Sequence, residues 1–255
     1  MSHSPSVTQS LLSWLLTIPF LFAFGATLVL FDPLQRIARL FGQRPQEIVA
    51  GAMQVGLVYA FRISGMHLMV ERSPEIKANR PYLLVANHQS MFDIPILGAT
   101  LFSNYPKYVS KRELARWLPG ISYNLRRGGN AIIERSDREQ ATRAIREMGA
   151  TAEARGVSAV IYPEGTRSRT GALRRFKKPG TFALFESAPG LPIVPVTIDG
   201  SWKLLAHNLL PLPFGTRVRL RIGDPIERTQ DEDNDALLRE VREQVEKTLE
   251  RWRSV

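Results

Sequence analysis

The sequence predicts an α/β protein with a mixed sheet covered by helices, preceded by an apolar helical segment that attaches the chain to a membrane. Two observations support this fold class. Residues 11–31 contain no charged side chain, and from residue 81 onward short runs of branched apolar residues alternate with segments of helical pattern. We therefore expect membrane-associated helices over residues 1–70 and a second domain, which includes a C-terminal helix, over residues 71–255.

The apolar run at residues 11–31 is about as long as a helix that crosses a bilayer core. Pro19 and several small polar residues within it are equally compatible with a helix, or a pair of helices, that lies in the membrane interface. Arg36, Arg39 and Arg44 follow the run while no Lys or Arg precedes it, which favours the cytoplasmic face of the cell membrane for the rest of the chain. The missing basic segment also argues against a cleaved signal peptide.

Residues 48–70 form a second apolar stretch, interrupted by Arg62 and His67. We interpret this stretch as an amphipathic helix that leads into the second domain, or as a core helix of that domain without lipid contact. In either case, membrane attachment depends mainly on residues 11–31.

Strands in the second domain are expected where branched residues are bounded by Gly, Pro or Asn. They cover residues 82–86, 131–133, 158–162, 193–198 and 217–222. Helical patterns cover residues 138–155 and 180–186, and residues 231–252 form a terminal helix that begins with acidic and ends with basic side chains. Because strands and helices alternate, ligands should bind at the loops beyond strand ends.

Composition limits the chemistry that this chain can perform. It contains no cysteine, which excludes disulfides, thiolate metal sites and a cysteine nucleophile. Its four histidines are far apart and none lies in an H-E-x-x-H pattern, so we expect no metal. The net charge of +10 is concentrated in residues 104–180, which contain 17 Lys and Arg against 7 Asp and Glu. Such a segment attracts phosphate-bearing molecules, although a solvated basic surface has the same composition.

The sequence N-H-Q-S-M-F-D at residues 87–93 directly follows the first expected strand, which places an imidazole at a strand end. Pro95 indicates that a helix begins near Asp93, because proline is tolerated in a helix's first turn. His88 in the loop could then meet Asp93, whose carboxylate would fix the tautomer and leave the other ring nitrogen free to accept a proton. Considered alone, Asp93 could equally be a helix N-cap and His88 an ordinary loop histidine.

No G-x-S-x-G motif occurs to supply a serine nucleophile, and no cysteine is present. The nucleophile would then be a hydroxyl group of the substrate. Direct transfer of an activated acyl group to an alcohol is therefore more natural for a His and Asp pair than hydrolysis through an acyl-enzyme, and water could still replace the alcohol.

A second group of candidate residues, Y-P-E-G-T-R-S-R at residues 162–169, also follows an expected strand. Gly165 allows close approach of the backbone to a ligand, and Arg167 offers a planar fork for a phosphate. Turn formation alone would explain the same residues, and Lys177 and Lys178 downstream could be phosphate ligands or a solvated basic patch. The absence of a G-x-x-x-x-G-K-[ST] or G-x-G-x-x-G motif leaves nucleotide hydrolysis and dinucleotide binding without support.

Taken together, four motifs resemble those of the glycerolipid acyltransferase family, specifically the bacterial lysophosphatidic acid acyltransferases, over roughly residues 60–200. N-H-x-x-x-x-D at residues 87–93 resembles the catalytic motif, and the stretch from K-R-E-L to I-I-E-R at residues 111–135 resembles the second motif. P-E-G-T-R-S at residues 163–168 and V-P-V at residues 194–196 resemble the third and fourth. Two residues depart from the family pattern: Tyr162 replaces the usual phenylalanine and Glu134 the usual aspartate.

The resemblance implies a role for each motif. His88 would deprotonate the acceptor hydroxyl and Asp93 would orient it, while Lys111 and Arg167 would bind the acceptor's phosphate and Pro195 would help to hold the donor. The complete set of implied substrate-binding residues is Asn87, Lys111, Arg135, Glu164, Gly165, Thr166, Arg167, Ser168 and Pro195, of which Glu164 and Gly165 would shape the acceptor pocket.

The implied reaction moves a fatty acyl group from acyl-CoA or acyl-carrier protein to lysophosphatidic acid and gives phosphatidic acid, with no metal or further cofactor. The sequence leaves open the donor, the chain length, the groups that stabilise the oxyanion and the oligomeric state. Two alternatives are an acyltransferase that acts on another lysolipid, and a non-catalytic membrane protein that binds anionic lipids through the basic residues 104–180. Nucleic acid is not expected as a partner, because no recognised binding motif occurs.

Overall fold

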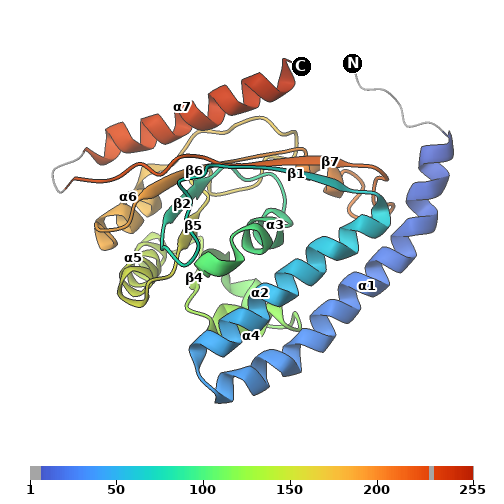
Figure 1. Ribbon diagram of the computed structural model, residues 1–255, viewed down its shortest axis with the longest axis horizontal. Coiled ribbons are helices and arrows are strands. Elements are labelled where there is room, and N and C mark those ends of the chain that lie inside the picture. The colour runs from blue at the N-terminus through green and yellow to red at the C-terminus, as the bar shows by residue number, and fades with distance from the viewer. Residues whose placement is uncertain (1–6, 230–232, 255) are drawn as a thin grey trace.

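A central sheet organises the computed structural model, which describes residues 7–229 and 233–254 (Figure 1). Within these residues the strands are β1 (His67–Arg72), β2 (Leu83–Ala86), β3 (Lys107–Lys111), β4 (Ala131–Ile133), β5 (Ala159–Ile161), β6 (Ile193–Asp199) and β7 (Arg217–Ile222). Their spatial order is β1-β7-β6-β2-β5-β3-β4. Strands β6 and β7 pair antiparallel and the other neighbours pair parallel, so the sheet is mixed, as predicted.

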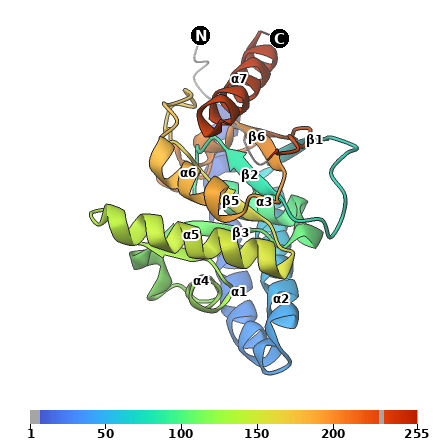
Figure 2. The ribbon, with the colours of Figure 1, turned by 90° about the vertical axis from the view of Figure 1, so that its left-hand side faces the viewer.

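Helices cover both faces of this sheet (Figures 1 and 2). The α-helices are α1 (Val7–Leu40), α2 (Gln43–Ala60), α3 (Asp93–Thr100), α4 (Ile121–Arg127), α5 (Arg138–Arg155), α6 (Lys178–Ser187) and α7 (Asn234–Arg253), and the 3-10 helices are η1 (Phe61–Ser64), η2 (Phe102–Asn104), η3 (Arg112–Ala115) and η4 (Ser201–Leu205). Helices α5, α6 and α7 share one hydrophobic core with the sheet, and α1 and α3 share another on its opposite face. All four residues of β2 are buried, because consecutive side chains enter opposite cores.

The predicted helix over residues 48–70 is wrong in its second half. Helix α2 ends at Ala60, η1 follows, and Gly65 takes a left-handed conformation (φ 68°) that turns the chain into β1. Strand β1 is an edge strand with mostly exposed side chains, so it lacks the alternation that identifies a half-buried strand. Strand β3 was also not predicted. It begins and ends with lysine, and Lys107 is nevertheless buried.

Helix α1 is fixed to the rest of the molecule near both of its ends. Near its start, Thr17 Oγ1 accepts a hydrogen bond from the backbone N–H of Leu212 at 2.9 Å. Near its end, Asp32 Oδ1 accepts from the Gly120 N–H at 2.8 Å, and Gln35 Nε2 donates to the Gly120 carbonyl at 3.1 Å. The helix therefore lies along the sheet domain over most of its length.

A buried ionic cluster ties α2 to the sheet. Glu47 Oε1 on α2 lies 2.7 Å from Lys107 Nζ on β3 and 2.7 Å from Arg155 Nη2 at the end of α5. Burial lowers the pKa of Lys107 to about 8, although the Glu47 carboxylate opposes this change. Removing Arg155 or Lys107 would leave the buried Glu47 carboxylate without full compensation. The cluster therefore joins α2 to β3 and α5.

Candidate active site

The structure brings His88 and Asp93 together at the carboxyl end of β2. His88 lies in the loop after β2, Asp93 is the first residue of α3, and His88 Nδ1 is 2.8 Å from Asp93 Oδ2. A carboxylate can only accept, so Nδ1 carries the proton and Nε2 keeps a free lone pair. The Asp93 side chain is fully buried, whereas 13% of the His88 side chain is exposed. One ring nitrogen of His88 is therefore bonded to a buried carboxylate, and part of the imidazole remains accessible to solvent.

Asp93 has further partners that fix its orientation. The same Oδ2 accepts hydrogen bonds from the backbone N–H groups of Gln89 at 2.7 Å and Ser90 at 2.9 Å, and Oδ1 accepts from Ser201 Oγ at 2.5 Å. These donors precede α3 or come from η4, and no side chain caps the start of α3. The N-cap interpretation of Asp93 is therefore wrong, because the carboxylate serves the histidine loop and not the helix.

The segment after β5 holds the backbone of His88. Glu164 Oε1 accepts from the His88 N–H at 2.8 Å, and Glu164 Oε2 accepts from the Arg174 N–H at 3.1 Å. The N–H of Ser168 donates to the His88 carbonyl at 2.8 Å. Burial raises the pKa of Glu164, against the effect of these hydrogen bonds. Glu164 and Ser168, predicted as substrate contacts, are buried, and both are bonded to the backbone of His88.

Two other predicted substrate-binding residues lie within the protein core. Both ends of the Asn87 side-chain amide are bonded to the backbone of Ile198, at 2.8 and 2.7 Å. Pro195 is a buried residue of β6 that lies opposite Val85 of β2 and accepts a hydrogen bond from the Gly223 N–H at 2.9 Å. Asn87 and Pro195 therefore join β6 to its neighbours, and their part in substrate binding stays a prediction.

A cleft of about 170 Å³ opens beside His88 at the carboxyl ends of β5, β3 and β4, the edge at which parallel strands collect ligands. Four predicted residues line it: His88, Lys111, Arg135 and Gly165. Lys177 lines it as well. Thr166 and the exposed Arg167 follow Gly165 on the same turn but do not belong to this lining. The cleft thus places basic side chains around the imidazole.

A second cavity, apolar and about 190 Å³ in volume, lies on the other side of the histidine loop. Met91 and Phe92 of that loop line it together with apolar residues of α1, α2, α3 and α4, and Ser110 lines both cavities. Sequence reasoning missed this cavity. The available signal was the pair of large apolar residues between His88 and Asp93.

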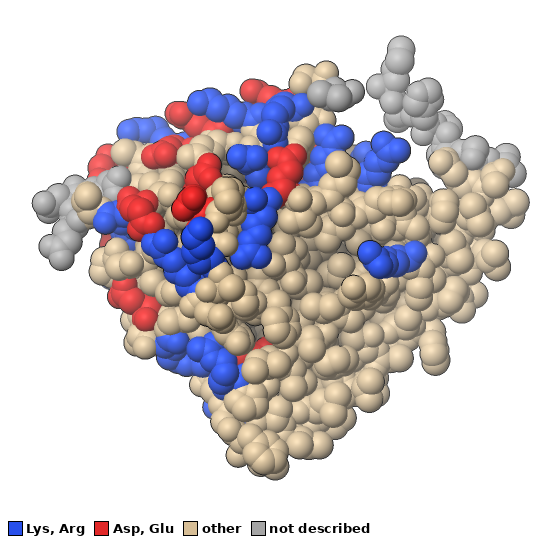
Figure 3. All heavy atoms as spheres, in the orientation of Figure 1, with Lys and Arg blue, Asp and Glu red and all other residues tan. Residues whose placement is uncertain are grey.

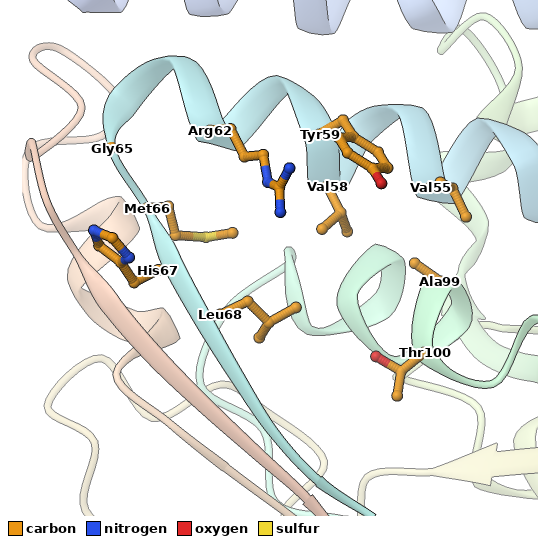
Figure 4. Close-up of a pocket in the computed structure, with 10 residues that line it drawn as sticks. All are labelled: Val55, Val58, Tyr59, Arg62, Gly65, Met66, His67, Leu68, Ala99 and Thr100. Carbon is orange, nitrogen blue, oxygen red and sulfur yellow. The ribbon is translucent and has the colours of Figure 1, made fainter.

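A larger hollow of about 640 Å³ lies between α2, β1 and α3 and contains none of the predicted site residues (Figure 4). Its polar lining includes Arg62, which lies over the ring of Tyr59 at 4.9 Å, and His67, which is exposed. No carboxylate belongs to this lining among the described residues. The hollow therefore lacks the histidine and carboxylate pair found at His88.

The far end of the chain also supports the site. Gln89, next to His88, and Arg253, at the end of α7, both donate to Asp199 Oδ1, at 3.2 and 2.6 Å. Both also donate to the carbonyl of Gly171, which lies between β5 and α6, at 3.4 and 2.8 Å. Burial alone would raise the pKa of Asp199, and the hydrogen bonds from Arg253 and Gln89 lower it below its usual value. This network links the C-terminal helix to the histidine loop.

Tyr162 supports the imidazole from a different direction. Its ring stacks on that of His88, with centroids 4.1 Å apart and planes inclined by 21°. The ring is buried, and its hydroxyl finds no hydrogen-bond partner among the described residues. Burial raises the pKa of Tyr162 well above its ordinary value. The stack supports the His88 ring, whereas the unpaired hydroxyl destabilises the folded protein.

Replacing Tyr162 with phenylalanine should therefore raise the free energy of unfolding by about 1 kcal/mol, because the ring is kept and an unpaired buried hydroxyl is removed. The variant should catalyse the reaction within about threefold of the original rate, since the stack on His88 remains. Thermal or denaturant unfolding measures the first effect. Tyr108→Phe is the matched control, because the Tyr108 hydroxyl donates to the Ile94 carbonyl at 3.2 Å and its loss should destabilise the protein. A Tyr162→Phe variant as unstable as the control would contradict the argument.

Comparison with known proteins agrees with this geometry. The family model described as Acyltransferase matches residues 67–199. The 1-acyl-sn-glycerol-3-phosphate acyltransferase of Saccharomyces cerevisiae is 30% identical over 175 residues, which cover 63% of this chain and 56% of the yeast protein. That of Escherichia coli is 26% identical over 187 residues, which cover 73% of this chain and 70% of the bacterial protein. This chain thus spans about half the length of the first curated relatives that it matches.

A solved structure extends the similarity to nearly the whole chain. The crystal structure of the 1-acyl-sn-glycerophosphate (LPA) acyltransferase PlsC from Thermotoga maritima superposes with a TM-score of 0.79 at 25% identity. The match covers 97% of this chain and 98% of the Thermotoga chain. The N-terminal helices are therefore part of the shared architecture.

Proposed function

This chain belongs to the acyltransferase family, and from that premise we propose that it transfers a fatty acyl group from acyl-CoA or acyl-carrier protein to the free hydroxyl of lysophosphatidic acid, giving phosphatidic acid. One observation carries the proposal: an imidazole oriented by a buried carboxylate, at the edge of a cleft lined by Lys111, Arg135 and Lys177. We propose no cofactor other than the thioester co-substrate.

The proposed reaction needs one base and no enzyme nucleophile. Nε2 of His88 takes the proton from the acceptor hydroxyl as the oxygen attacks the thioester carbonyl. The new C–O bond forms, the C–S bond breaks, and the proton passes from the imidazolium to the departing thiolate. The buried Asp93 carboxylate stabilises the transient positive charge on His88, since its Oδ2 lies 2.8 Å from Nδ1. General-base assistance of this kind contributes about 10²–10⁴ in rate.

The two cavities near His88 suit two different parts of the proposed substrates. The basic cleft fits the phosphate of the acceptor, and the apolar cavity, lined by Met91 and Phe92, fits a fatty acyl chain. Because these residues lie between His88 and Asp93 in the sequence, a chain held there would lie next to the imidazole. This arrangement supports an acyl lipid substrate over a water-soluble one.

The phosphate role is tested by Lys111→Met, which keeps much of the apolar stem and removes the charge. We expect the KM for lysophosphatidic acid to rise about tenfold with a smaller change in kcat, because the lost contact binds the acceptor before and during the reaction. With monoacylglycerol, an acceptor without phosphate, the variant and the original enzyme should differ little. Lys247→Met, on the exposed side of α7, is the control. An unchanged KM for lysophosphatidic acid would remove the phosphate role of Lys111.

The activity itself is tested by thiol release from acyl-CoA and from acyl-carrier protein in the presence of several lysolipids. Release that depends on lysophosphatidic acid and yields phosphatidic acid supports the proposal. Equal or faster thiol release with another lysolipid would mean that this lysolipid, and not lysophosphatidic acid, is the acceptor. Vesicle binding without thiol release from either donor would indicate a lipid-binding protein without this activity.

We propose that α1 attaches the protein to the cytoplasmic face of the membrane by lying in the interface. By length and composition, α1 is the one helix of the described residues that could span a membrane. Only 11% of its most apolar stretch is buried inside the protein. Its exposed apolar residues are Leu11, Trp14, Leu15, Ile18, Leu21, Phe22, Val29, Leu30, Leu34, Ile37 and Leu40. The surface over α1 and α2 in Figure 3 is almost free of charged side chains. Because α1 is bonded to the sheet domain near both ends, an interfacial position fits better than a span perpendicular to the bilayer.

A further inference from the structure

The segment between η3 and α4 exposes a large aromatic side chain to solvent. Trp117 is 88% exposed, and its neighbours Leu114 and Leu118 are 40% and 39% exposed. Arg112 and Arg116 are exposed on the same segment, together with Glu113. Residues 112–118, here called the Trp117 segment, thus combine an aromatic ring, two leucines and two arginines, a combination typical of the bilayer interface.

The Trp117 segment is held firmly against the helical pair. Gly120 has a positive φ of 67°, and its N–H and carbonyl are both bonded to α1 through Asp32 and Gln35. A Cβ at this position would lie 2.6 Å from Met53 Sδ and 3.0 Å from a backbone carbonyl oxygen of α1. Three residues span at most about 11 Å, so Trp117 is close to α1 whatever the local conformation. Helix α1 packs against both α2 and α4 (Figure 2).

Further hydrogen bonds close the segment into a compact turn. Ser122 Oγ accepts from the Leu118 N–H at 2.8 Å and donates to the Leu114 carbonyl at 3.1 Å. Arg126 donates to the Ala115 carbonyl. The exposure of Trp117 is therefore imposed by a turn that these three hydrogen bonds hold in place.

The Trp117 segment also marks an opening of the apolar cavity. Leu114, Leu118 and Met91 line that cavity, and each is between 39% and 44% exposed. Side chains that line a cavity and also reach solvent define a place where the cavity meets the surface. Trp117 stands beside this opening.

We propose that the Trp117 segment is a second membrane contact, which presses into the headgroup region of an anionic lipid surface and turns the mouth of the apolar cavity toward the lipid. Trp117 and the two leucines supply apolar burial, and Arg112 and Arg116 attract anionic headgroups. Contact at both α1 and this segment fixes the rotation of the protein about the long axis of α1. The passage of acyl chains through the opening rests on the proposed function, whereas the contact itself does not.

The absence of cysteine from the chain permits a direct test with a single introduced thiol. Trp117→Cys and, as the control on the outer face of α7, Glu243→Cys are each labelled with an environment-sensitive fluorophore. They are mixed with vesicles of phosphatidylcholine that contain phosphatidylglycerol. We expect a blue shift and an increase in emission at position 117 and no change at position 243. A label at position 117 that stays in water while the labelled protein sediments with the vesicles would overturn the proposal, as would a failure of the original protein, which keeps Trp117, to bind these vesicles.

A second measurement uses the side chain itself. Trp117→Ala should weaken binding to these vesicles about tenfold, as expected for the loss of a buried indole, and Trp117→Phe should restore part of it. Thiol release from a short-chain, water-soluble thioester without vesicles should be unaffected, because Trp117 does not touch the basic cleft. Equal vesicle binding by the alanine variant and the original protein would contradict the proposal. Neither readout depends on which lysolipid is the acceptor.

Discussion

Replacing His88 with alanine should lower the rate of acyl transfer by about 10²–10⁴-fold, because the change removes the proposed general base. The fold should survive, since the imidazole is partly exposed and the backbone N–H and carbonyl of His88 keep their bonds to Glu164 and Ser168. The loss should appear in kcat more than in the KM for lysophosphatidic acid, whose phosphate contacts remain.

The matched control is His67→Ala, which removes an exposed histidine from the hollow beside β1 and should leave the rate unchanged. Circular dichroism and vesicle sedimentation establish that both variants are folded and still attach to lipid. If His88→Ala transfers acyl groups as fast as His67→Ala, the imidazole is not the base and the proposed mechanism is wrong.

Much of the fold followed from local pattern. Branched runs bounded by Gly, Pro or Asn predicted strands β2, β4, β5, β6 and β7, and the helix over residues 138–155 was predicted with the bounds of α5. The prediction failed where the tertiary environment overrides local pattern. Strand β1 is stabilised by parallel pairing with β7, about 150 residues away in the sequence, and no periodicity within residues 67–72 reveals that partner.

The candidate site shows what motif letters can and cannot convey. The proximity of His88 and Asp93 followed from one proline and one strand end, because those features fix the local geometry. The directions of Asn87 and Glu164 did not follow, since each side chain bonds to a residue far away in the sequence. Asn87 bonds to Ile198, 111 residues away, and Glu164 bonds to His88, 76 residues away. The apolar cavity was unpredictable for the same reason: its walls come from separate helices that meet only in the folded chain.

Several residues of this site hold His88 in place. His88 is held by a carboxylate at its ring, a tyrosine on its face and two bonds to its backbone. Preorganisation of this kind avoids reorganisation during the reaction and accounts for the burial of polar side chains around one small loop. Among these residues, Asp93 is the one whose charge, as well as its shape, should affect the rate of acyl transfer.

Replacing Asp93 with asparagine separates these two contributions. The amide is nearly isosteric. Its oxygen can accept from Nδ1 of His88 and from the N–H groups of Gln89 and Ser90, and its nitrogen can donate to Ser201, whose hydroxyl can rotate to accept. Stability should therefore change little. The rate should fall by about 10²–10⁴-fold, because a neutral amide does not stabilise the imidazolium that forms as the acceptor loses its proton.

Ser201→Ala provides the opposite test, because it keeps the negative charge and removes one donor to Oδ1 of Asp93. A buried carboxylate oxygen that loses its donor costs about 1–3 kcal/mol, so this variant should unfold more readily while its rate falls by about tenfold or less. Asparagine at position 93 should thus lose rate without losing stability, and alanine at position 201 should mainly lose stability. Such a crossed result cannot arise from general loosening of the site, which would lower rate and stability together in both variants. An Asp93→Asn enzyme with an undiminished rate would mean that the carboxylate only places the imidazole and that the charge it carries has no part in the transfer.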